Sequence, residues 1–252
     1  MNLRHSIIIP HRNRLEYLRL CLWALRRSAE ACGQSNYEII VVDNRSILLP
    51  NPQQRLRVVK DDRRMPVFNK PMLLNRGMDE ANGEVLTFLD ADAVVGKEWM
   101  ACQQSLVDDP GLTRLCYRGR GLPESYLVTS NGDLRERIDA AFGRYGRFPL
   151  KHEARGEPQT TCLKGEPLFG NSQFSIRRDV LGDLRWNEEY EGAGFEDMWM
   201  IREIWRRAGD GYRAVIPAEP QRSIFLIEHR QDQHDWRTDA ALAANRQRYM
   251  TS

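Results

Sequence analysis

The sequence is poor in cysteine and has no long apolar run, and each of these features excludes a class of protein. Its five cysteines are scattered without a Cys-x-x-Cys pair, which argues against a disulfide framework or a zinc site. We therefore expect reduced thiols and a cytoplasmic location. No apolar stretch approaches the roughly 18 residues of a membrane span. The strand-like run Ser6–Ile9 ends at Pro10, too early for a signal peptide.

Neither sign of charge predominates, since 37 Lys and Arg against 35 Asp and Glu leave a net charge of +2. Nucleic-acid-binding domains usually carry a clustered basic excess, so we expect no nucleic-acid partner. The segment Pro10–Arg14 after the first predicted strand contains no glycine. It therefore has neither the GxGxxG fingerprint of a dinucleotide oxidoreductase nor the Gly-rich triphosphate loop of a nucleotidyltransferase.

The first hundred residues alternate between strand and helix patterns. Short apolar runs predict strands at Ser6–Pro10, Glu38–Val42, Leu56–Val59 and Val85–Leu89. Apolar residues at helical spacing predict two helices, one from Leu15 to Gly33 and one from Pro71 to Asn82-Gly83. This alternation predicts an α/β fold with a mostly parallel central sheet and helices on both faces.

The second half is less regular. The Gly-, Arg- and Pro-rich segment from Arg114 to Phe169 predicts loops and short elements over the crevice, with a helix-like stretch near Leu134–Ala141. Further predicted elements are a strand at Asn171–Ile176, a helix opened by Gly192–Asp197, strands at Tyr212–Ile216 and Ser223–Ile227, and a polar C-terminal helix. We expect one domain over residues 1–252, with no repeat.

Polar clusters follow three of the predicted strands, at Pro10–Arg14, Asp43-Asn44 and Asp90-Ala91-Asp92. In open α/β sheets, ligands bind at the carboxyl ends of the strands. Two carboxylates two residues apart at such an end can share Mg²⁺ or Mn²⁺ with the diphosphate that the ion bridges. Asp43 either caps a loop or binds a base or ribose, and the two arginines could hold a base or a diphosphate.

Glu196 and Asp197 stand after a Gly-rich turn in the first turn of a predicted helix. Acids at this position stabilise a helix by roughly 0.3–1 kcal/mol through its dipole. One of them could instead act as the general base that deprotonates an acceptor hydroxyl. The two interpretations are compatible. His229 follows the last apolar run and is either structural or a metal ligand, with His234 as the competing candidate.

Taken together, these segments resemble the β-1,4-galactosyltransferases and, more broadly, the family-2 glycosyltransferases of GT-A fold. Ile7–Arg14 resembles their Ile-Ile-Pro-Phe-Arg-Asn-Arg, and Phe68–Gly77 resembles Phe-Asn-Arg-x-x-Leu-Leu-Asn-x-Gly. Asp90-Ala91-Asp92 matches the metal-binding Asp-x-Asp, Gly192–Asp197 resembles Gly-x-Gly-Gly-Glu-Asp, and Glu228-His229-Arg230 resembles Arg-His-Ser. The five blocks occur in family order.

The resemblance implies an inverting, metal-dependent transfer of a sugar from a UDP-sugar to an acceptor hydroxyl. It assigns the base to Asp197 and the binding of sugar or acceptor hydroxyls to Glu196. Asp92 and His229 would hold Mn²⁺ (or Mg²⁺) with the donor diphosphate. The residues that it places at the nucleotide are Pro10, Arg12, Arg14, Asp43, Phe68, Asp90 and Ala91.

The same resemblance implies a nucleotide-binding half at residues 1–113 and an acceptor-binding half at 114–252. The acceptor is a glycan or another hydroxyl compound, and a lipid-linked acceptor would bring the protein to a membrane surface. Phe195 stands where the family has a glycine, Met198 where it has a further acid, and the Trp of its Trp-Gly-Gly motif is absent. These departures leave UDP-galactose and UDP-N-acetylhexosamine open as donors. The alternative functions are a non-catalytic nucleotide-sugar-binding module and a sugar nucleotidyltransferase.

Overall fold

The computed structural model describes residues 5–51, 54–116, 119–123, 134–145, 152–155, 173–192, 194–217, 222, 224–228 and 239–252. Within these ranges, eight strands form the central sheet in the order β3-β2-β1-β4-β9-β6-β10-β8. Their bounds are β1 (His5–His11), β2 (Tyr37–Asp43), β3 (Leu56–Lys60), β4 (Val85–Phe88), β6 (Arg114–Cys116), β8 (His152–Arg155), β9 (Phe174–Arg177) and β10 (Arg213–Ile216). Only β8 and β9 of these strands run against the others, so the sheet is mostly parallel.

A second sheet of three described strands has the order β5-β11-β7. Its strands are β5 (Ala93–Val95), β7 (Gly119–Pro123) and β11 (Ile224–Glu228). The helices are α1 (Leu15–Ala31), α2 (Lys70–Glu80), α3 (Gln104–Asp108), α5 (Leu134–Tyr145), α6 (Arg178–Leu181), α7 (Glu196–Ala208) and α8 (Asp239–Thr251), with 3₁₀ turns η1 (Trp99–Gln103) and η2 (Gly209–Gly211). None of the described helices is long and apolar enough to cross a membrane.

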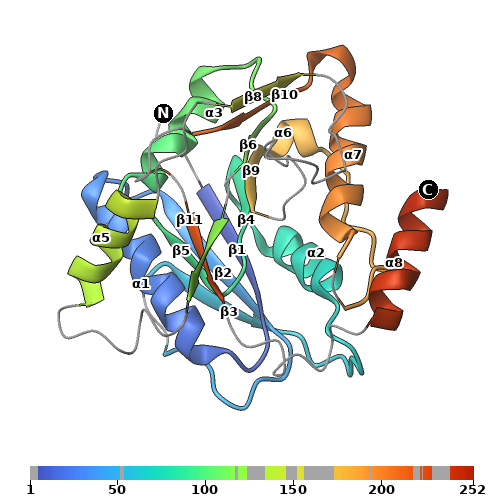
Figure 1. The fold of residues 1–252 in the computed structure, drawn as a ribbon, viewed down its shortest axis with the longest axis horizontal. Helices are drawn as coiled ribbons and strands as arrows, with labels where there is room; N and C mark the ends of the chain where they lie inside the picture. Colours follow the sequence, from blue (N-terminus) through green and yellow to red (C-terminus); the bar gives the residue numbers. More distant parts are fainter. Residues whose placement is uncertain are drawn as a thin grey trace.

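Helices cover both faces of the central sheet, with α1 and α5 on one side and α2 and α7 on the other (Figure 1). The alternation of side chains along β1 explains this arrangement. Ile7 and Ile9 pack into the core under α1, whereas Ile8 packs into the core under α2 and α7. A strand buried on both faces reads as a continuous apolar run, as Ile7–Ile9 does. The predicted α/β class is confirmed.

Helix α2 shows how local sequence positions an element near the site. The side chain of Asn69 accepts a hydrogen bond from the Met72 N–H at 3.0 Å, and Pro71 occupies the first turn. Gly77 lets the helix approach β1 closely, because a Cβ atom there would lie 2.3 Å from Cγ2 of Ile8. The predicted helices from Leu15 and from Pro71 are both confirmed, and Gly33 beyond α1 has the left-handed φ of 63° that favours glycine.

The structure differs from the prediction mainly in the second half. Residues 114–116 and 152–155 are strands of the central sheet, where we had expected loops and short elements over the crevice. Helix α5 confirms the helix predicted near Leu134. The strand predicted from Asn171 begins at Phe174 and inserts antiparallel between β4 and β6, and β11 joins the second sheet. These pairings depend on contacts between distant segments, which periodicity does not encode.

Candidate active site

The carboxyl ends of β1, β2 and β4 meet at one edge of the central sheet. β1 and β2 pair in register up to His11 opposite Asp43, and β4 runs parallel to β1 and leads to Asp90. Because parallel strands end at the same edge, the three predicted polar clusters lie together. The structure thus brings together the strand-end residues that the sequence had singled out.

At the end of β2, the Asp43 carboxylate is held by a buried network that the sequence did not predict. His11 Nδ1 lies 2.7 Å from Asp43 Oδ1, and the Ser46 N–H donates to Asp43 Oδ2 at 3.0 Å. The Arg14 N–H donates to His11 Nε2 at 3.2 Å, so Nδ1 carries the proton of this imidazole. Burial opposes ionisation of Asp43, but the hydrogen bonds from His11 and Ser46 outweigh it and hold the pKa below its usual value.

Three other residues predicted at the nucleotide, Pro10, Arg12 and Phe68, lie at the end of β1 and in the connections that follow the strands. Arg12 extends to the connection before α2, where its Nη1 donates to the Met65 carbonyl at 3.2 Å. Pro10 is buried at the end of β1, and Phe68 is half-buried against the core beneath α2. The Phe68 carbonyl accepts a hydrogen bond from the Gly192 N–H at 3.0 Å, which joins this side to the turn before α7.

The Asp90-Ala91-Asp92 segment is fixed by groups from four parts of the chain. Lys70 forms an ion pair with Asp90, and the Gln173 amide both donates to the Asp90 side chain and accepts from its N–H at 2.9 Å. Arg14 Nη1 lies 3.7 Å from Asp92 Oδ2. The Asp92 carbonyl accepts the Ile227 N–H of β11 at 3.1 Å. Ala91 between the two acids is buried, so the carboxylates are the chemically active part of the segment.

The acid pair Glu196-Asp197 opens α7, as the Gly-rich turn predicted. Phe195 precedes it with φ 70° and ψ −13°, a left-handed conformation that costs a residue with a side chain of order 1–3 kcal/mol. Asp197 Oδ1 accepts the Met198 N–H at 2.8 Å, which agrees with the helix-capping interpretation. Glu196 is 8% exposed, and its Oε2 has no hydrogen-bond partner among the described residues. One acid therefore caps the helix while the other keeps a carboxylate oxygen for another partner.

The pKa values of the acid pair respond to the charges of Lys70 and Asp90. Burial, followed by the negative charge of Asp197, raises the pKa of Glu196 to about 7, against the opposing charge of Lys70. Burial also raises the pKa of Asp197, which Lys70 lowers and Asp90 raises further. The pKa of Lys70 is raised because the charges of Asp90, Glu196 and Asp197 outweigh the effect of burial. The start of α7 therefore lies within the electrostatic range of the Lys70–Asp90 ion pair.

Lys70 is a site residue that the sequence analysis missed, although a signal was present. It occupies the arginine position of the Phe-Asn-Arg block used in the resemblance. His11 was missed as well, because its role depends on pairing with a residue 32 positions away. His229 and His234 lie outside the described residues, and among the described ones no group of three His, Cys, Asp or Glu side chains is arranged to hold a metal. The predicted convergence of Asp92, Asp197 and His229 on one ion stays a prediction.

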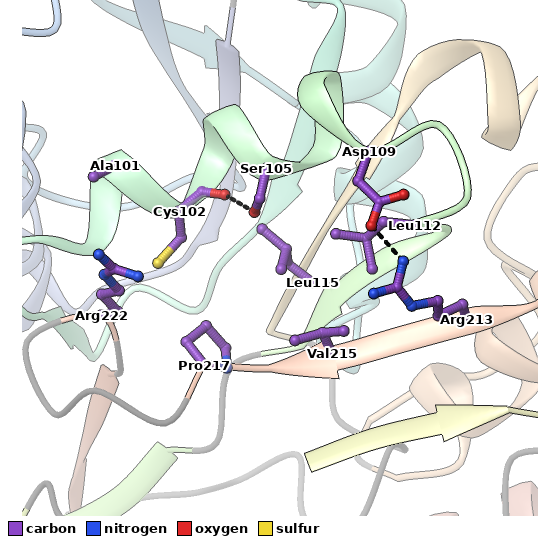
Figure 2. Close-up of a pocket in the computed structure, with 10 residues that line it drawn as sticks. All are labelled: Ala101, Cys102, Ser105, Asp109, Leu112, Leu115, Arg213, Val215, Pro217 and Arg222. Carbon is purple, nitrogen blue, oxygen red and sulfur yellow. Dashed lines mark hydrogen bonds and ion pairs between the residues drawn. The ribbon is translucent and has the colours of Figure 1, made fainter. Parts of the chain in front are cut away.

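A separate cavity of about 280 Å³ lies between η1, α3 and β10 (Figure 2). Its charged groups include Arg213, which is bound to Asp109, and Arg222, whose Nε lies 3.7 Å from Glu98. Leu112, Leu115 and Val215 form an apolar part of its wall, and none of the predicted site residues lines it. We assign it no part in the candidate active site.

Residues 6–122 match the model of glycosyl transferase family 2. The glycosyltransferase AglE of Haloferax volcanii is 26% identical over 198 residues, which cover 75% of this chain and 62% of AglE. The amylovoran biosynthesis glycosyltransferase AmsB of Erwinia amylovora is 24% identical over 243 residues, which cover 91% of this chain and 72% of AmsB. These matches support a role in glycosyl transfer.

The TarS 1–349 crystal structure from S. aureus in complex with UDP superimposes with a TM-score of 0.60 at 16% identity, covering 99% of this chain and 72% of that one. The fold is the GT-A fold. A second GT-A neighbour is the mannosyltransferase PcManGT from Pyrobaculum calidifontis in complex with GDP-Man and Mn²⁺. Its TM-score is 0.56 at 18% identity, covering 93% of this chain and 59% of that one.

The chain is shorter than several of these relatives, since it spans 62% of AglE and 60% of one TarS 1–349 crystal structure. It shares with the GT-A neighbours the α/β core that brings the carboxyl ends of β1, β2 and β4 together. The likeness at this level of identity concerns the fold, and the chemistry of the site is argued from the residues of this chain.

Proposed function

We propose that the protein is an inverting glycosyltransferase that moves a sugar from a UDP-sugar to an acceptor hydroxyl, with Mn²⁺ or Mg²⁺ at the diphosphate. The observation that carries this proposal is the ion pair of Lys70 with Asp90, with the acid pair of α7 near enough for its negative charges to raise the pKa of Lys70. The lysine cation supplies positive charge for a leaving diphosphate, and a carboxylate of the acid pair supplies the base for an incoming hydroxyl. The family-2 match and the GT-A fold agree with it.

The carboxylates after β4 suit a hard divalent ion. Asp90 and Asp92 offer carboxylate oxygens at a strand end. Lys70 balances the charge of Asp90, and Arg14 balances that of Asp92. Mg²⁺ and Mn²⁺ are commonly held by one or two carboxylates, with substrate phosphates and water as the other ligands. We infer that Asp92 binds the ion and that His229, two residues beyond Ile227, is its second protein ligand. When bound, the ion neutralises negative charge on the donor diphosphate.

In the proposed reaction, Asp197 takes the proton from the acceptor hydroxyl. The acceptor oxygen then forms a bond to the anomeric carbon from the face opposite the diphosphate, while the bond from that carbon to the diphosphate oxygen breaks. Lys70 lies beside Asp90 and is placed to balance the charge that develops on the leaving UDP. Glu196, buried and partly protonated near neutral pH, binds a sugar or acceptor hydroxyl.

On the nucleotide side, we assign Arg12, Arg14, Asp43 and Phe68, together with Pro10, Asp90 and Ala91, to the uridine and its phosphates. His11 and Ser46 hold Asp43 ionised in the position from which it would accept hydrogen bonds from the base. In this proposal, residues 1–252 form one domain in which residues 1–113 bind the nucleotide and residues 114–252 bind the acceptor. The donor sugar is a galactose or an N-acetylhexosamine, by the resemblance of the sequence blocks to the β-1,4-galactosyltransferases.

The acceptor is a glycan or another hydroxyl compound, and a lipid-linked acceptor is consistent with one surface feature. Ile47 and Leu48 are 89% and 64% exposed in the connection between β2 and β3, and the Ile47 N–H is bound to Asn13 at 3.1 Å, beside the end of β1. Arg45 next to them is also exposed. Exposed apolar side chains with a basic neighbour favour contact with an anionic lipid surface. Replacing both with serine should reduce cosedimentation with phosphatidylglycerol vesicles, whereas Val107→Ser on α3 should not.

The donor is tested by incubating the protein with Mn²⁺ and UDP-galactose, UDP-GalNAc, UDP-GlcNAc, UDP-glucose or GDP-mannose, and by measuring both hydrolysis and thermal stabilisation. We expect one UDP-sugar to be hydrolysed slowly and to raise the melting temperature by mass action. Binding without hydrolysis or transfer to any acceptor would favour the non-catalytic module. Release of pyrophosphate from a nucleoside triphosphate and a sugar phosphate would favour the nucleotidyltransferase.

A further inference from the structure

The C-terminal helix α8 lies beside the start of α7, where the acid pair stands (Figure 1). Tyr249 of α8 is 5% exposed, and its ring lies 5.7 Å from the ring of Phe195 between centroids, at an interplanar angle of 36°. Arg202 of α7 fixes Tyr249 in turn, because its guanidinium lies 4.3 Å from the Tyr249 ring and its Nη1 donates to the Tyr249 carbonyl at 3.1 Å. The two helices are therefore joined by a packed aromatic pair and a cation.

The same helix contacts the turn that leads into the acid pair. The buried Asn245 side chain donates to the Glu191 carbonyl at 2.8 Å, and Arg248 Nε lies 3.5 Å from Glu189 Oε2. Leu242 covers Gly194, where an added Cβ atom would lie 2.7 Å from Leu242 Cδ1. Helix α8 thus contacts the backbone or side chains of the turn at four positions, Phe195 included.

Phe195 is the position at which these contacts matter for the acid pair. Its left-handed φ of 70° is a conformation that glycine adopts freely and a phenylalanine does not. Its ring compensates by packing on Tyr249, which ties the strained residue to α8. The next two residues are Glu196 and Asp197, so the backbone angles of Phe195 set where both carboxylates point.

We propose that α8 is a strap that positions the proposed catalytic pair: Tyr249 holds Phe195 in its left-handed conformation and so fixes the direction in which Glu196 and Asp197 leave the turn. Phe195 and Tyr249 are positioning residues, since they act through the acid pair. The proposal rests on the function assigned above. It predicts that loosening the strap impairs the transfer step more than nucleotide binding, because the nucleotide side is held by β1, β2 and β4 and their own hydrogen bonds.

The first test compares Tyr249→Ala with Tyr249→Phe, which keeps the ring, and with Gln247→Ala, an exposed position on the same helix. We expect Tyr249→Ala to lower kcat about tenfold or more, with the donor KM and the affinity for UDP within about twofold of wild type, since small misplacements of a base are costly. Tyr249→Phe and Gln247→Ala should keep kcat near wild type. A Tyr249→Ala enzyme with unchanged kcat, or with kcat and UDP affinity lowered together, would overturn the strap.

The second test asks whether Tyr249 acts through residue 195. A glycine there adopts the turn without strain, so the strap becomes dispensable. In the Phe195→Gly background, adding Tyr249→Ala should change kcat less than about twofold, although it lowers kcat about tenfold in the wild-type background. Equal losses in the two backgrounds would show that Tyr249 acts elsewhere and would refute the proposal.

A third readout does not depend on activity, and so separates failure of the strap from failure of the proposed function. The carboxyl carbon of Glu196 can be titrated by carbon-13 NMR, with Lys70, Asp90 and Asp197 as the charged groups that face it. The wild type should titrate near pH 7, and Tyr249→Ala should titrate nearer the ordinary glutamate value as water reaches the turn. If the wild type transfers no sugar but the titration of Glu196 still shifts in Tyr249→Ala, the strap proposal stands and the proposed function is wrong. If Glu196 titrates at the same pH in Tyr249→Ala as in the wild type, the strap proposal is wrong.

Discussion

The two sides of the candidate site are built in opposite ways. On the side that we propose binds the nucleotide, the nucleotide side below, Asp43 is surrounded by donors, and its pKa is held below the usual value. On the acid-pair side, Glu196 is buried and its neighbour Asp197 is half-buried, and both pKa values are raised. A carboxylate with its hydrogen bonds made contributes to a rigid binding surface, whereas a buried acid with a displaced pKa is suited to exchange a proton.

The backbone shows the same contrast. The nucleotide side sits at the ends of regular parallel strands, in register from His5 opposite Tyr37 to His11 opposite Asp43. The acid pair follows a turn with positive φ at Gly192, Gly194 and Phe195. Strained backbone is kept only where surrounding contacts hold it, and here α8 supplies them. The comparison suggests that stability is concentrated on one side and reactivity on the other.

The largest effect is expected from Asp197→Asn, which removes the proposed base without changing its shape. We expect kcat to fall about 10²-fold or more, while UDP binding in Mn²⁺ survives, because proton transfer by a positioned base contributes 10²–10⁴ in rate. Steady-state kinetics and calorimetry measure the two quantities. Asp210→Asn, an exposed aspartate beyond α7, is the matched control. Near-full transfer by Asp197→Asn would place the base elsewhere.

Lys70→Met should both weaken UDP binding and change the titration of the acid pair, since the charge of Lys70 acts on both sides of the site. Loss of a charge-assisted contact to a diphosphate corresponds to about tenfold or more in UDP affinity. The pKa values of Glu196 and Asp197 should rise further, because Lys70 opposes their elevation. Calorimetry of UDP binding and the pH profile of kcat test the two effects, with the exposed Lys97→Met as control. If UDP affinity stays at the wild-type value, Lys70 belongs to the acid pair alone.

Glu196→Gln probes the stability cost of the buried acid. The pKa of Glu196 is about 7 in the folded protein and near 4.5 when it is unfolded. Its protonated form therefore favours folding at low pH, and this contribution is lost as the pH rises from about 4.5 through 7. Relative to wild type, Glu196→Gln should gain stability over that window, on the order of 1–3 kcal/mol. Urea melts at pH 5 and pH 8 measure it, and a pH-independent difference would contradict the raised pKa.

The smallest effect is expected from Asp43→Asn, on the side already satisfied by hydrogen bonds. The pKa of Asp43 is lowered by folding, so its stabilisation is present above the ordinary aspartate value and is lost as the pH falls through the folded pKa. At pH 7 we expect a loss of about 0.5–1.5 kcal/mol, the usual net contribution of one hydrogen bond, because the asparagine oxygen can still accept in part. Thermal melts at pH 7 and at pH 3 should show the difference shrinking in acid. The exposed Asp62→Asn serves as the comparison.

The sequence predicted the nucleotide side of the fold well because its signals are local. Ile7–Ile9, the helix from Leu15 and the Pro71 helix all follow from periodicity and end signals within a few residues. The insertion of β9 between β4 and β6 could not be predicted, since it depends on pairing with strands some 60 to 90 residues earlier in the chain. The acid pair was found because its Gly-rich turn is local. Lys70 and His11 were missed because their importance comes from distant partners.

The insertion of β9 has a consequence for how the protein is made. Gln173, directly before β9, binds Asp90 across a separation of 83 residues, so the carboxylate after β4 gains this partner only after residue 173 has been synthesised. Contacts of such separation form late, after local helices and hairpins. A ribosome-bound chain that ends near residue 122 should therefore hold β1 to β4 without a finished Asp90 segment. Affinity for the proposed UDP-sugar donor is then expected only once the stretch up to residue 177 has left the exit tunnel.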